Sequence, residues 1–314
     1  MQIPLAGQTT GKPGSPVERL GFARRNQRKR RVAFLAFSLP AMIWFLIWMA
    51  WPLINMFRIS LLRWDGLLKK SSFIGLANYQ HMTSDVLFEH ALRNTAIHLA
   101  VGLPAVLIPA FILGFFLSLR LRGFRALRFI FFIPAMVSVA ALAMMFYGIY
   151  MPEGILNASL KFFGLEAWTH NWLADPLTVL GSIIFIDIWT GIGFYAVLFF
   201  AVLSNQPGEL YEAARLDGAS LWTILWRIAF PLSRGFFGVA AMLHFLWILT
   251  GAAQNVLILT KGGPGDYSLT LGYYLYNQAF VVQRLGYSQA LGVFLFIVGL
   301  AGLFLIRQTF RQSD

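Results

Sequence analysis

Long apolar blocks separated by shorter polar connections dominate the pattern of this sequence. Six blocks hold about 20 or more residues with few charges, enough to cross roughly 30 Å of hydrocarbon at about 1.5 Å of rise per residue. A chain that folds in water alternates apolar and polar positions instead. The pattern therefore predicts an all-α membrane protein with six transmembrane helices, near residues 32–57, 95–119, 127–150, 177–203, 236–260 and 287–306.

Composition agrees with this fold class. Hydrophobic residues make up 58% of the chain and charged residues 12%, about half the charged share of soluble domains, so a soluble enzyme is excluded. The chain has no cysteine, which excludes disulfides, thiolate chemistry and cysteine-ligated metals. The net charge of +12 would suit nucleic acid, but the basic residues flank the apolar blocks, where they face lipid headgroups.

The N-terminal segment reads as a basic cytoplasmic tail. Residues 1–23 are rich in Gly, Pro, Gln and Thr, and six basic residues follow in 24–31, so 1–31 is predicted to be disordered. The apolar stretch after it is about twice the length of a signal-peptide core. It is therefore a retained first span that opens a six-span domain over 32–312.

Lysine and arginine set the orientation. Seventeen of the 25 basic residues fall in the tail, in the second and fourth connections and at the C-terminal end. The side richer in Lys and Arg faces the cytoplasm, so both termini are predicted to be cytoplasmic in a multi-pass protein of the cell (inner) membrane.

Two connections, 58–94 outside and 204–235 inside, are longer than a simple turn needs. In the inner one, Pro207 suits a helix start and Gly218 suits the left-handed residue that ends a helix, after which Ser220 can cap the next. This predicts two short helices joined by a bend at Asp217-Gly218, with Pro231 ending the second helix before span five.

The inner connection resembles a known loop. Its tripeptide at 212–214, its Asp-Gly-Ala at 217–219, and Ile228 and Pro231 match the "EAA" loop of permeases in ATP-binding-cassette (ABC) importers, with Phe230 and Gly235 as mild departures. The resemblance implies that the loop docks as a coupling helix on a cytoplasmic ATPase. The coupling residues that it implies are Glu212, Ala213, Ala214, Arg215, Asp217 and Gly218.

The resemblance covers about residues 30–312 and narrows the class. Segments 73–79 and 91–95 are similar to carbohydrate-uptake permeases, and 259–264 with Tyr276 and 279–280 resembles the larger permease subunit of maltose-type importers. It implies a sugar importer, for a di- or oligosaccharide, with a polyol or a glycerol phosphodiester as alternatives. The implied partners are a second six-span permease forming a heterodimer, two ATPase subunits and an extracytoplasmic solute-binding protein.

No cofactor is expected on this chain itself, since ATP and Mg²⁺ belong to the ATPase. Segment 7–13 resembles a phosphate-binding loop, but it has one residue too few between its glycines and Pro13 in place of Ser or Thr. We therefore expect a non-catalytic transport subunit.

Three ionisable residues lie well inside the spans, and a charge there costs about 3 kcal/mol. Asp187 is one of them. In span four, a glycine and two aromatic residues follow Asp187 at i+4, i+7 and i+8, so they share its helical face, and span five repeats the same intervals. Helix faces that carry aromatic rings, glycines and amide groups suit a sugar, because its rings stack on aromatics and its hydroxyls need hydrogen bonds. Small and polar residues can also serve only to pack helices together. The predicted substrate-binding residues are Asp187, Gly191, Phe194, Tyr195, Trp247, Gln254 and Asn255.

The other two ionisable residues are His98 and His244. His98 is placed near the outer end of span two and His244 has no acid partner in its neighbourhood of the sequence, so structural roles are expected for both. Trp189 lies off the predicted face, as a wall of the pocket or facing lipid. With so few ligands, no metal site is expected.

Two other classes fit less well. An intramembrane enzyme would need paired acids, a Ser/His arrangement or a metal cluster, and the spans offer none. An ion-coupled secondary transporter typically has inverted repeats and buried charges in both halves, whereas here one asymmetric cytoplasmic loop accompanies a single mid-span acid.

Overall fold

The computed structural model describes residues 34–35, 37–66, 68–119 and 123–311. The predicted tail, Arg120 and Arg122 lie outside these residues. The described chain divides into two units, before and after residue 55. The first is helical, with a π-helical turn η1 (Leu46–Ala50) followed by the start of α2 (Trp51–Ser60).

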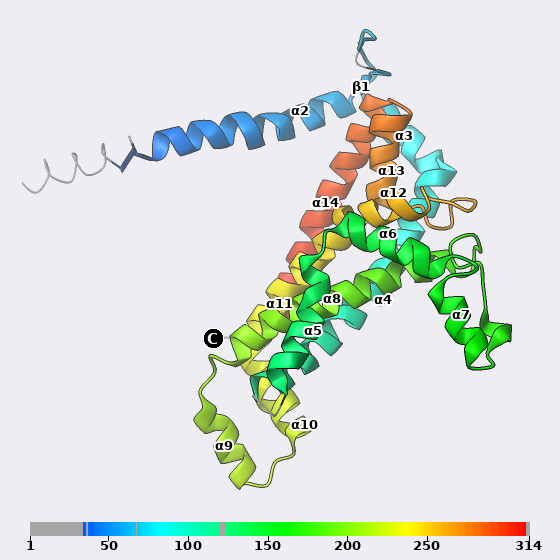
Figure 1. Cartoon of the computed structure of the whole chain (residues 1–314). Coiled ribbons are helices and arrows are strands. Elements are labelled where there is room, and N and C mark those ends of the chain that lie inside the picture. Colours follow the sequence, from blue (N-terminus) through cyan, green and yellow to red (C-terminus); the bar gives the residue numbers. More distant parts are fainter. Residues whose placement is uncertain (1–33, 36, 67, 120–122, 312–314) are drawn as a thin grey trace, which may run out of the picture. The chain divides into compact units, whose positions relative to one another are not determined.

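The second unit is almost entirely helical (Figure 1). Before the connection 204–235, here called the α9 loop, its strands and helices are β1 (Leu62–Arg63), β2 (Ser72–Phe73), α3 (Ala77–Ser84), α4 (Val86–Ser118), α5 (Phe124–Met136), α6 (Val139–Tyr150), α7 (Ile155–Phe162), η2 (Glu166–Trp168) and α8 (Val179–Leu203). The later helices are α9 (Gly208–Leu216), α10 (Leu221–Ile224), η3 (Leu225–Ala229), α11 (Phe230–Leu246), η4 (Trp247–Gly251), α12 (Ala253–Leu259), α13 (Leu271–Tyr276), η5 (Asn277–Val281) and α14 (Leu285–Phe310).

Among the described residues, six helices are long and apolar enough to cross a membrane, which confirms the predicted number. They are Phe37–Ser60, Val86–Ser118, Val139–Phe162, Val179–Leu203, Leu221–Leu259 and Leu285–Phe310. The second and fifth are longer than predicted, because each helix continues into a segment that the sequence pattern assigned to a loop.

The third predicted span, 127–150, is wrong: the third helix long enough to cross a membrane is Val139–Phe162, and the predicted stretch is not one continuous helix. It breaks at Val137 and Ser138, where the backbone is extended. Ser138 caps α6, since its hydroxyl accepts a hydrogen bond from the Ala141 N–H at 3.3 Å. Pro134 lies one turn earlier inside α5. The serine cap and the missing proline N–H together favour the end of one helix and the start of another.

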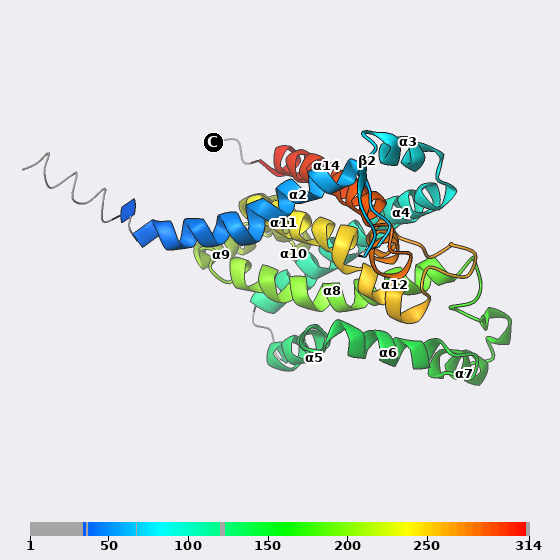
Figure 2. The ribbon, with the colours of Figure 1, turned by 90° about the horizontal axis from the view of Figure 1, so that it is seen from above.

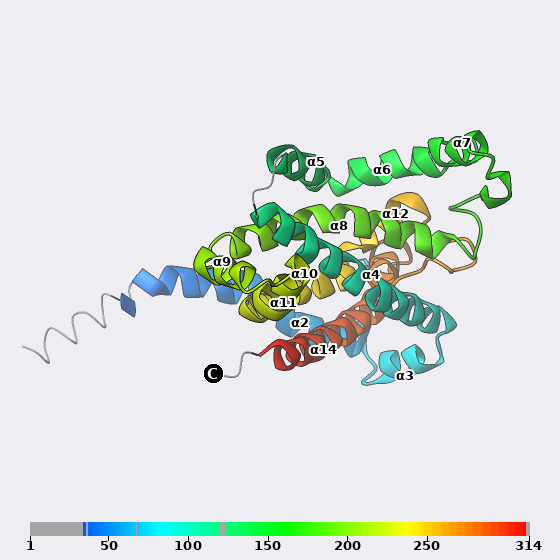
Figure 3. The ribbon, with the colours of Figure 1, turned by 90° about the horizontal axis from the view of Figure 1, so that it is seen from below.

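The helices of the second unit pack in layers, as Figures 2 and 3 show from opposite sides. Helix α8 lies between α4 on one side and the broken span α5–α6 on the other, and α11 contacts both α4 and α14. Aromatic and aliphatic side chains form two buried clusters. One lies around Phe111 and Phe199, near the α9 loop, and the other around Tyr273 and Leu291, toward the opposite end of the bundle.

The end of the bundle opposite the α9 loop, here called the α3 end, is held together by Asp85. Its carboxylate accepts hydrogen bonds from Tyr274 and from Tyr287, the latter at 2.6 Å, and one from the N–H of Leu87 at 3.0 Å. Burial by itself raises the pKa of Asp85, but these hydrogen bonds stabilise the ionised form and hold the pKa below its ordinary value. The start of α4 is thereby joined to α13 and α14.

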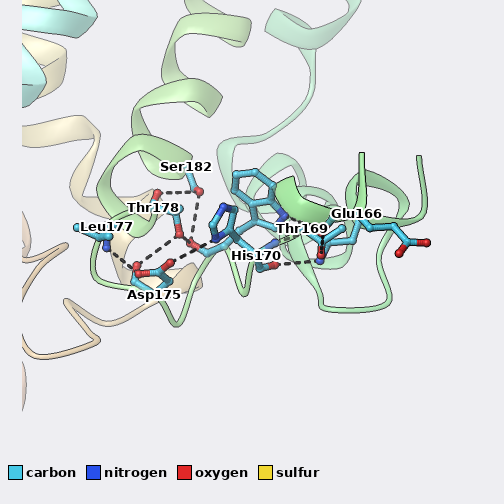
Figure 4. Close-up of polar contacts among 9 residues, drawn as sticks. Glu166, Thr169, His170, Asp175, Leu177, Thr178 and Ser182 are labelled. Atoms are coloured by element: carbon cyan, nitrogen blue, oxygen red, sulfur yellow. Dashed lines mark hydrogen bonds and ion pairs between the residues drawn. The ribbon is translucent and has the colours of Figure 1, made fainter. Parts of the chain in front are cut away.

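The connection from α7 to α8 also lies at the α3 end and has a polar centre, part of which Figure 4 shows. Asn157 is buried, and its side chain bonds the Pro152 and His170 carbonyls and accepts from Trp172 Nε1 at 2.8 Å. Thr178 donates to the Trp172 carbonyl at 3.0 Å, beside the start of α8. The start of α8 is therefore held in place by a hydrogen-bonded loop.

The α9 loop has the predicted local geometry in its first half. Helix α9 follows Pro207, and Gly218 has φ +78°, a conformation that costs other residues about 1–2 kcal/mol. Ser220 caps the next helix by accepting from Thr223 N at 3.2 Å. The prediction that Pro231 ends this helix is wrong: α10, η3 and α11 run on without a break. The π-helical turn just before Pro231 changes the local hydrogen-bond pattern.

Candidate functional site

Asp187 lies at the centre of a buried polar cluster in the second unit. Its side chain is 2% exposed. Trp247 donates its indole N–H to Oδ1 at 2.6 Å. His98 Nε2 lies 3.1 Å from Oδ2, and His244 Nε2 lies 3.5 Å from the same oxygen. Three helical segments, α4, α8 and α11–η4, thus meet at one carboxylate, at the level where the two apolar clusters adjoin.

The expectation that His244 has no acid partner is therefore wrong. Asp187 precedes it by 57 positions on another helix, so the pairing depends on how the helices pack and cannot be seen in the neighbouring sequence. His98 lies twelve residues after the start of α4 and also contacts Asp187, a pairing that the sequence analysis did not predict.

A cavity of about 360 Å³ opens beside this cluster. The described residues that line it are Pro134, Val137, Val139, Leu142, Ile186, Asp187, Thr190, Gly191, Phe194, Tyr195, Leu243, His244, Trp247 and Asn255. They come from the break between α5 and α6, one face of α8, and the segment from α11 to α12. Its volume lies within the range of small-molecule sites.

Six of the seven predicted substrate-binding residues lie on this wall. Gln254 is the exception: its side chain is exposed and does not line the cavity, while the neighbouring Asn255 is buried and lines it. The predicted face assumed α-helical spacing after Trp247. The π-helical turn Trp247–Gly251 has more residues per turn and so rotates the chain less per residue, which takes the position seven residues on off the face and keeps the next one on it.

Two glycines on the predicted faces have packing reasons to be glycine. A Cβ on Gly191 would lie 2.8 Å from Val106 Cγ1, because α8 approaches α4 closely there. A Cβ on Gly251 would lie 2.4 Å from the Trp247 ring, so its absence lets the indole lie along its own helix and reach Asp187. Gly191 therefore both lines the cavity and allows α8 to pack closely against α4.

Trp189 does not line the cavity. Its ring lies edge-on to Phe146, with centroids 5.4 Å apart, and its side chain is 39% exposed. Of the two predicted alternatives, a pocket wall or a surface facing lipid, the exposed position agrees with the second.

Sequence reasoning missed the wall formed by the broken third span and by Thr190. Pro134, Val137 and Val139 reach the cavity because the helix ends and restarts beside it. The signal was present as a proline followed four residues later by a serine cap. Thr190 was missed although it follows Asp187 by three residues and so shares its helical face; its hydroxyl bonds the Ile186 carbonyl at 2.8 Å.

The cavity wall offers aromatic faces together with an unused hydrogen-bonding group. Asn255 Oδ1 is buried without a hydrogen-bond partner among the described residues, whereas His244 Nε2 has Asp187 Oδ2 3.5 Å away. An unpaired buried polar atom of this kind costs about 1–3 kcal/mol unless a ligand or water meets it. Tyr195, edge-on to His244 at 5.2 Å, adds an aromatic face. Such a wall suits a molecule with both apolar faces and hydroxyl groups.

The same cluster does not have the geometry of a metal centre. Asp187 and the two imidazoles contact one another directly, and within 34–35, 37–66, 68–119 and 123–311 no group of three or more His, Asp or Glu side chains is arranged to hold an ion.

The residues implied for ATPase coupling form a separate surface on α9. Glu212, Ala213 and Arg215 are exposed, as are Asp217 and Gly218 in the bend. Ala214 instead is partly buried and packs, with Tyr211, against the apolar cluster around Phe111. One side of α9 thus rests on the bundle and the other is free. Leu216, 90% exposed, extends the free side with an apolar side chain.

Comparison with known proteins defines the class. The family of binding-protein-dependent transport system inner membrane components matches residues 110–311. The "Probable ABC transporter permease protein YurN" of Bacillus subtilis is 34% identical, over 84% of this chain and 91% of its own length. The "Diacetylchitobiose uptake system permease protein NgcF" of Streptomyces coelicolor is 32% identical, over 95% and 88%.

Solved structures agree on the fold. A chain in the crystal structure of a bacterial alginate ABC transporter, in complex with an alginate pentasaccharide-bound periplasmic protein, superposes with a TM-score of 0.79 at 22% identity, covering 91% of this chain and 96% of that one.

These matches, together with the six apolar helices, show that the chain is a multi-pass permease subunit of an ABC transporter. It belongs to the family of binding-protein-dependent transport system inner membrane components.

Proposed function

We propose that this chain carries a sugar, a di- or oligosaccharide, across the cytoplasmic membrane as one permease of an ATP-driven importer. It works with a second six-span permease, two ATPase subunits that bind ATP and Mg²⁺, and an extracytoplasmic solute-binding protein. It hydrolyses no ATP itself. Its similarity to NgcF along 95% of the chain supports a sugar as cargo.

The observation that carries the proposal is the wall of the cavity. Trp247, Tyr195 and Phe194 give aromatic surfaces on which sugar rings stack, and Asn255 Oδ1 is an acceptor, without a hydrogen-bond partner in the described chain, that a sugar hydroxyl can meet. Asp187 holds Trp247 in place through the 2.6 Å hydrogen bond. Within this proposal Asn255 contacts the sugar and Asp187 positions the aromatic wall.

The adjacent pair Asn255 and Gln254 provides a matched test. Asn255→Ala removes a group that lines the cavity, whereas Gln254→Ala removes an exposed amide next to it. Losing one hydrogen bond to a buried sugar costs about 1–3 kcal/mol, or roughly five- to a hundredfold in affinity. We expect Asn255→Ala to raise the half-saturating sugar concentration for uptake into proteoliposomes and Gln254→Ala to leave it unchanged.

The same preparations are melted to separate binding from packing. If Asn255 only packs helices, Asn255→Ala lowers the melting temperature while uptake per folded complex stays the same. That outcome removes the cavity from the proposed function.

We further propose that α9 faces the cytoplasm and docks on the ATPase, with both chain termini on the same side. The excess of basic residues on that side supports this orientation. Because the chain has no cysteine, single cysteines report it directly. Cysteines at 161 and 261 should react with a membrane-impermeant thiol reagent from outside and a cysteine at 215 should not; the reverse pattern contradicts the orientation.

A further inference from the structure

Helix α7 and the turn after it present large apolar side chains that the described residues leave uncovered. Ile155 and Phe162 lie seven residues apart, on the same face of α7, and Phe162 is 84% exposed. The ring of Phe163 lies edge-on to that of Phe162, with centroids 5.3 Å apart. Trp168, in η2, is 68% exposed. These four residues are called the α7 patch, and an exposed apolar surface of this kind marks a contact with another protein or with a membrane.

The opposite face of α7 is fixed to the bundle. Leu156 packs against the apolar cluster around Tyr273 and Leu291. The next residue, Asn157, is buried and donates to the His170 carbonyl at 2.9 Å. The α7 patch is therefore held on the outside by a helix whose inner face is packed and hydrogen-bonded.

A bend sets the direction of α7. The apolar stretch Val139–Phe162 turns between α6 and α7, where the Gly154 N–H donates to the Met151 carbonyl at 2.8 Å. A Cβ on Gly154 would lie 2.5 Å from the carbonyl oxygens of Gly148 and Ile149, so the tight turn needs a glycine. Figure 1 shows α7 leaving the direction of α6 at this turn. A helix that leaves the direction of its span at the end of the bundle can lie along the membrane surface.

The α7 patch continues a surface that already belongs to the membrane. Met144, Tyr147 and Met151 are exposed and lie at i, i+3 and i+7, so they form one stripe along α6 and into the bend. Ile155 follows directly after the bend and is exposed as well. Tryptophan is enriched at the boundary between lipid and water, because its ring is apolar and its N–H is polar. The position of Trp168 beyond the end of this stripe agrees with that boundary.

Charge shows which force would hold such a contact. The connection 151–178 contains three acidic residues, Glu153, Glu166 and Asp175, and one lysine, Lys161. Surface helices held by electrostatic attraction to anionic lipids are rich in lysine and arginine on their polar face. With more acids than bases in this connection, the apolar contact has to supply the attraction.

We propose that α7 lies in the headgroup region of the membrane at the α3 end, with the α7 patch inserted among the lipids and no requirement for anionic lipid. The contact anchors the end of α6 whose earlier residues Val139 and Leu142 line the cavity. It goes beyond the proposed function, because it holds for any solute that the cavity takes.

Spin labels at single cysteines test this position in the complete importer. The chain has no cysteine of its own, so Phe162→Cys and the matched control Glu166→Cys, also exposed and near the same end of α7, each carry one nitroxide. The importer is reconstituted in phosphatidylcholine vesicles, and collisions with oxygen, which concentrates in lipid, are compared with collisions with a water-soluble nickel chelate. We expect the label at 162 to collide more with oxygen and the label at 166 more with nickel. Trp168→Cys replaces Phe162→Cys if the latter lowers the melting temperature.

Three outcomes overturn the inference. Equal oxygen-to-nickel ratios at 162 and 166 would show that the α7 patch faces water. A label at 162 that is shielded from both reagents, or that loses its oxygen collisions when the solute-binding protein is added, would show that a protein covers the patch. An oxygen preference at 162 that needs phosphatidylglycerol in the vesicles would show electrostatic binding instead of apolar insertion.

Discussion

The α9 loop and the polar cavity depend on different kinds of information in the sequence. In the loop, each feature comes from residues within a few positions of one another: Gly218 bends the chain and Ser220 caps the next helix. In the cavity, Asp187 meets His98 and Trp247, which are 89 and 60 positions away. Local hydrogen bonds and backbone preferences are readable from sequence, whereas a meeting of three helices depends on packing along their whole length.

The largest expected effect tests how closely α8 packs against α5 beside the cavity. A Cβ on Gly193 would lie 1.8 Å from the Phe131 carbonyl oxygen, where α8 meets α5. Backbone cannot move aside as a flexible side chain can, so Gly193→Ala should destabilise by about 3 kcal/mol and displace the α5–α6 wall. Gly181→Ala, on the same helix with open space around it, is the control. Equal melting temperatures for the two variants would contradict the close approach of α8 and α5.

The next effect belongs to the loop. Gly218→Val places a β-branched residue at φ +78° and should cost about 1–2 kcal/mol of local strain, which changes the direction in which α9 points. Gly208→Val, at the start of α9 with nothing within 4 Å, is the control. We expect the ATPase recovered with the purified permease to fall for Gly218→Val alone. Equal recovery for both variants would argue against docking through α9.

A smaller local effect concerns the cap after the bend. Ser220→Ala removes the acceptor for the Thr223 N–H and should weaken the first turn of the fifth-span helix by about 1 kcal/mol. Ser220→Asp keeps an acceptor and should behave like the unaltered chain. Hydrogen exchange at residues 221–223 measures this. Faster exchange in Ser220→Asp than in Ser220→Ala would contradict the cap.

The smallest effect is a pH dependence at the α3 end. Hydrogen bonds from Tyr274 and Tyr287 lower the pKa of Asp85 from its ordinary value of 3.8, so its ionised form stabilises the folded state above about pH 4. That contribution is lost as the pH falls through the lowered pKa. Asp85→Asn should melt lower than the unaltered complex at pH 7, with the gap narrowing below pH 4. A difference in melting temperature that grows below pH 4 would contradict a lowered pKa for Asp85.

Much of the fold could be predicted from sequence because hydrophobic length and local signals decide it. The six apolar blocks correspond to six helices, within the described residues, that are long enough to span a membrane. Pro207, Gly218 and Ser220 correctly predicted the start of α9, the bend and the cap of the next helix. Two errors came from treating a residue pattern as regular helix. Pro134 and Ser138 break the third span, and Pro231 does not end its helix because a π-helical turn precedes it.

The predicted sugar-binding faces failed at one position for the same physical reason. Six predicted residues line the cavity, while Gln254 leaves it because the π-helical turn at 247–251 rotates the residues after it. The acid partner of His244 could not be predicted, since Asp187 reaches it only after α4, α8 and α11 have packed.

The central claim, that a sugar occupies this cavity, is tested most directly by substrate protection of single cysteines. Phe194 and Trp189 are matched: both are aromatic, both lie on α8, and their side chains are 43% and 39% exposed, but only Phe194 lines the cavity. In the reconstituted importer, Phe194→Cys and Trp189→Cys are labelled with a small thiol reagent with and without the transported sugar. The account predicts that sugar slows labelling of Phe194→Cys and leaves Trp189→Cys unchanged. Equal labelling rates for Phe194→Cys with and without sugar, in an importer that takes up that sugar, would contradict it.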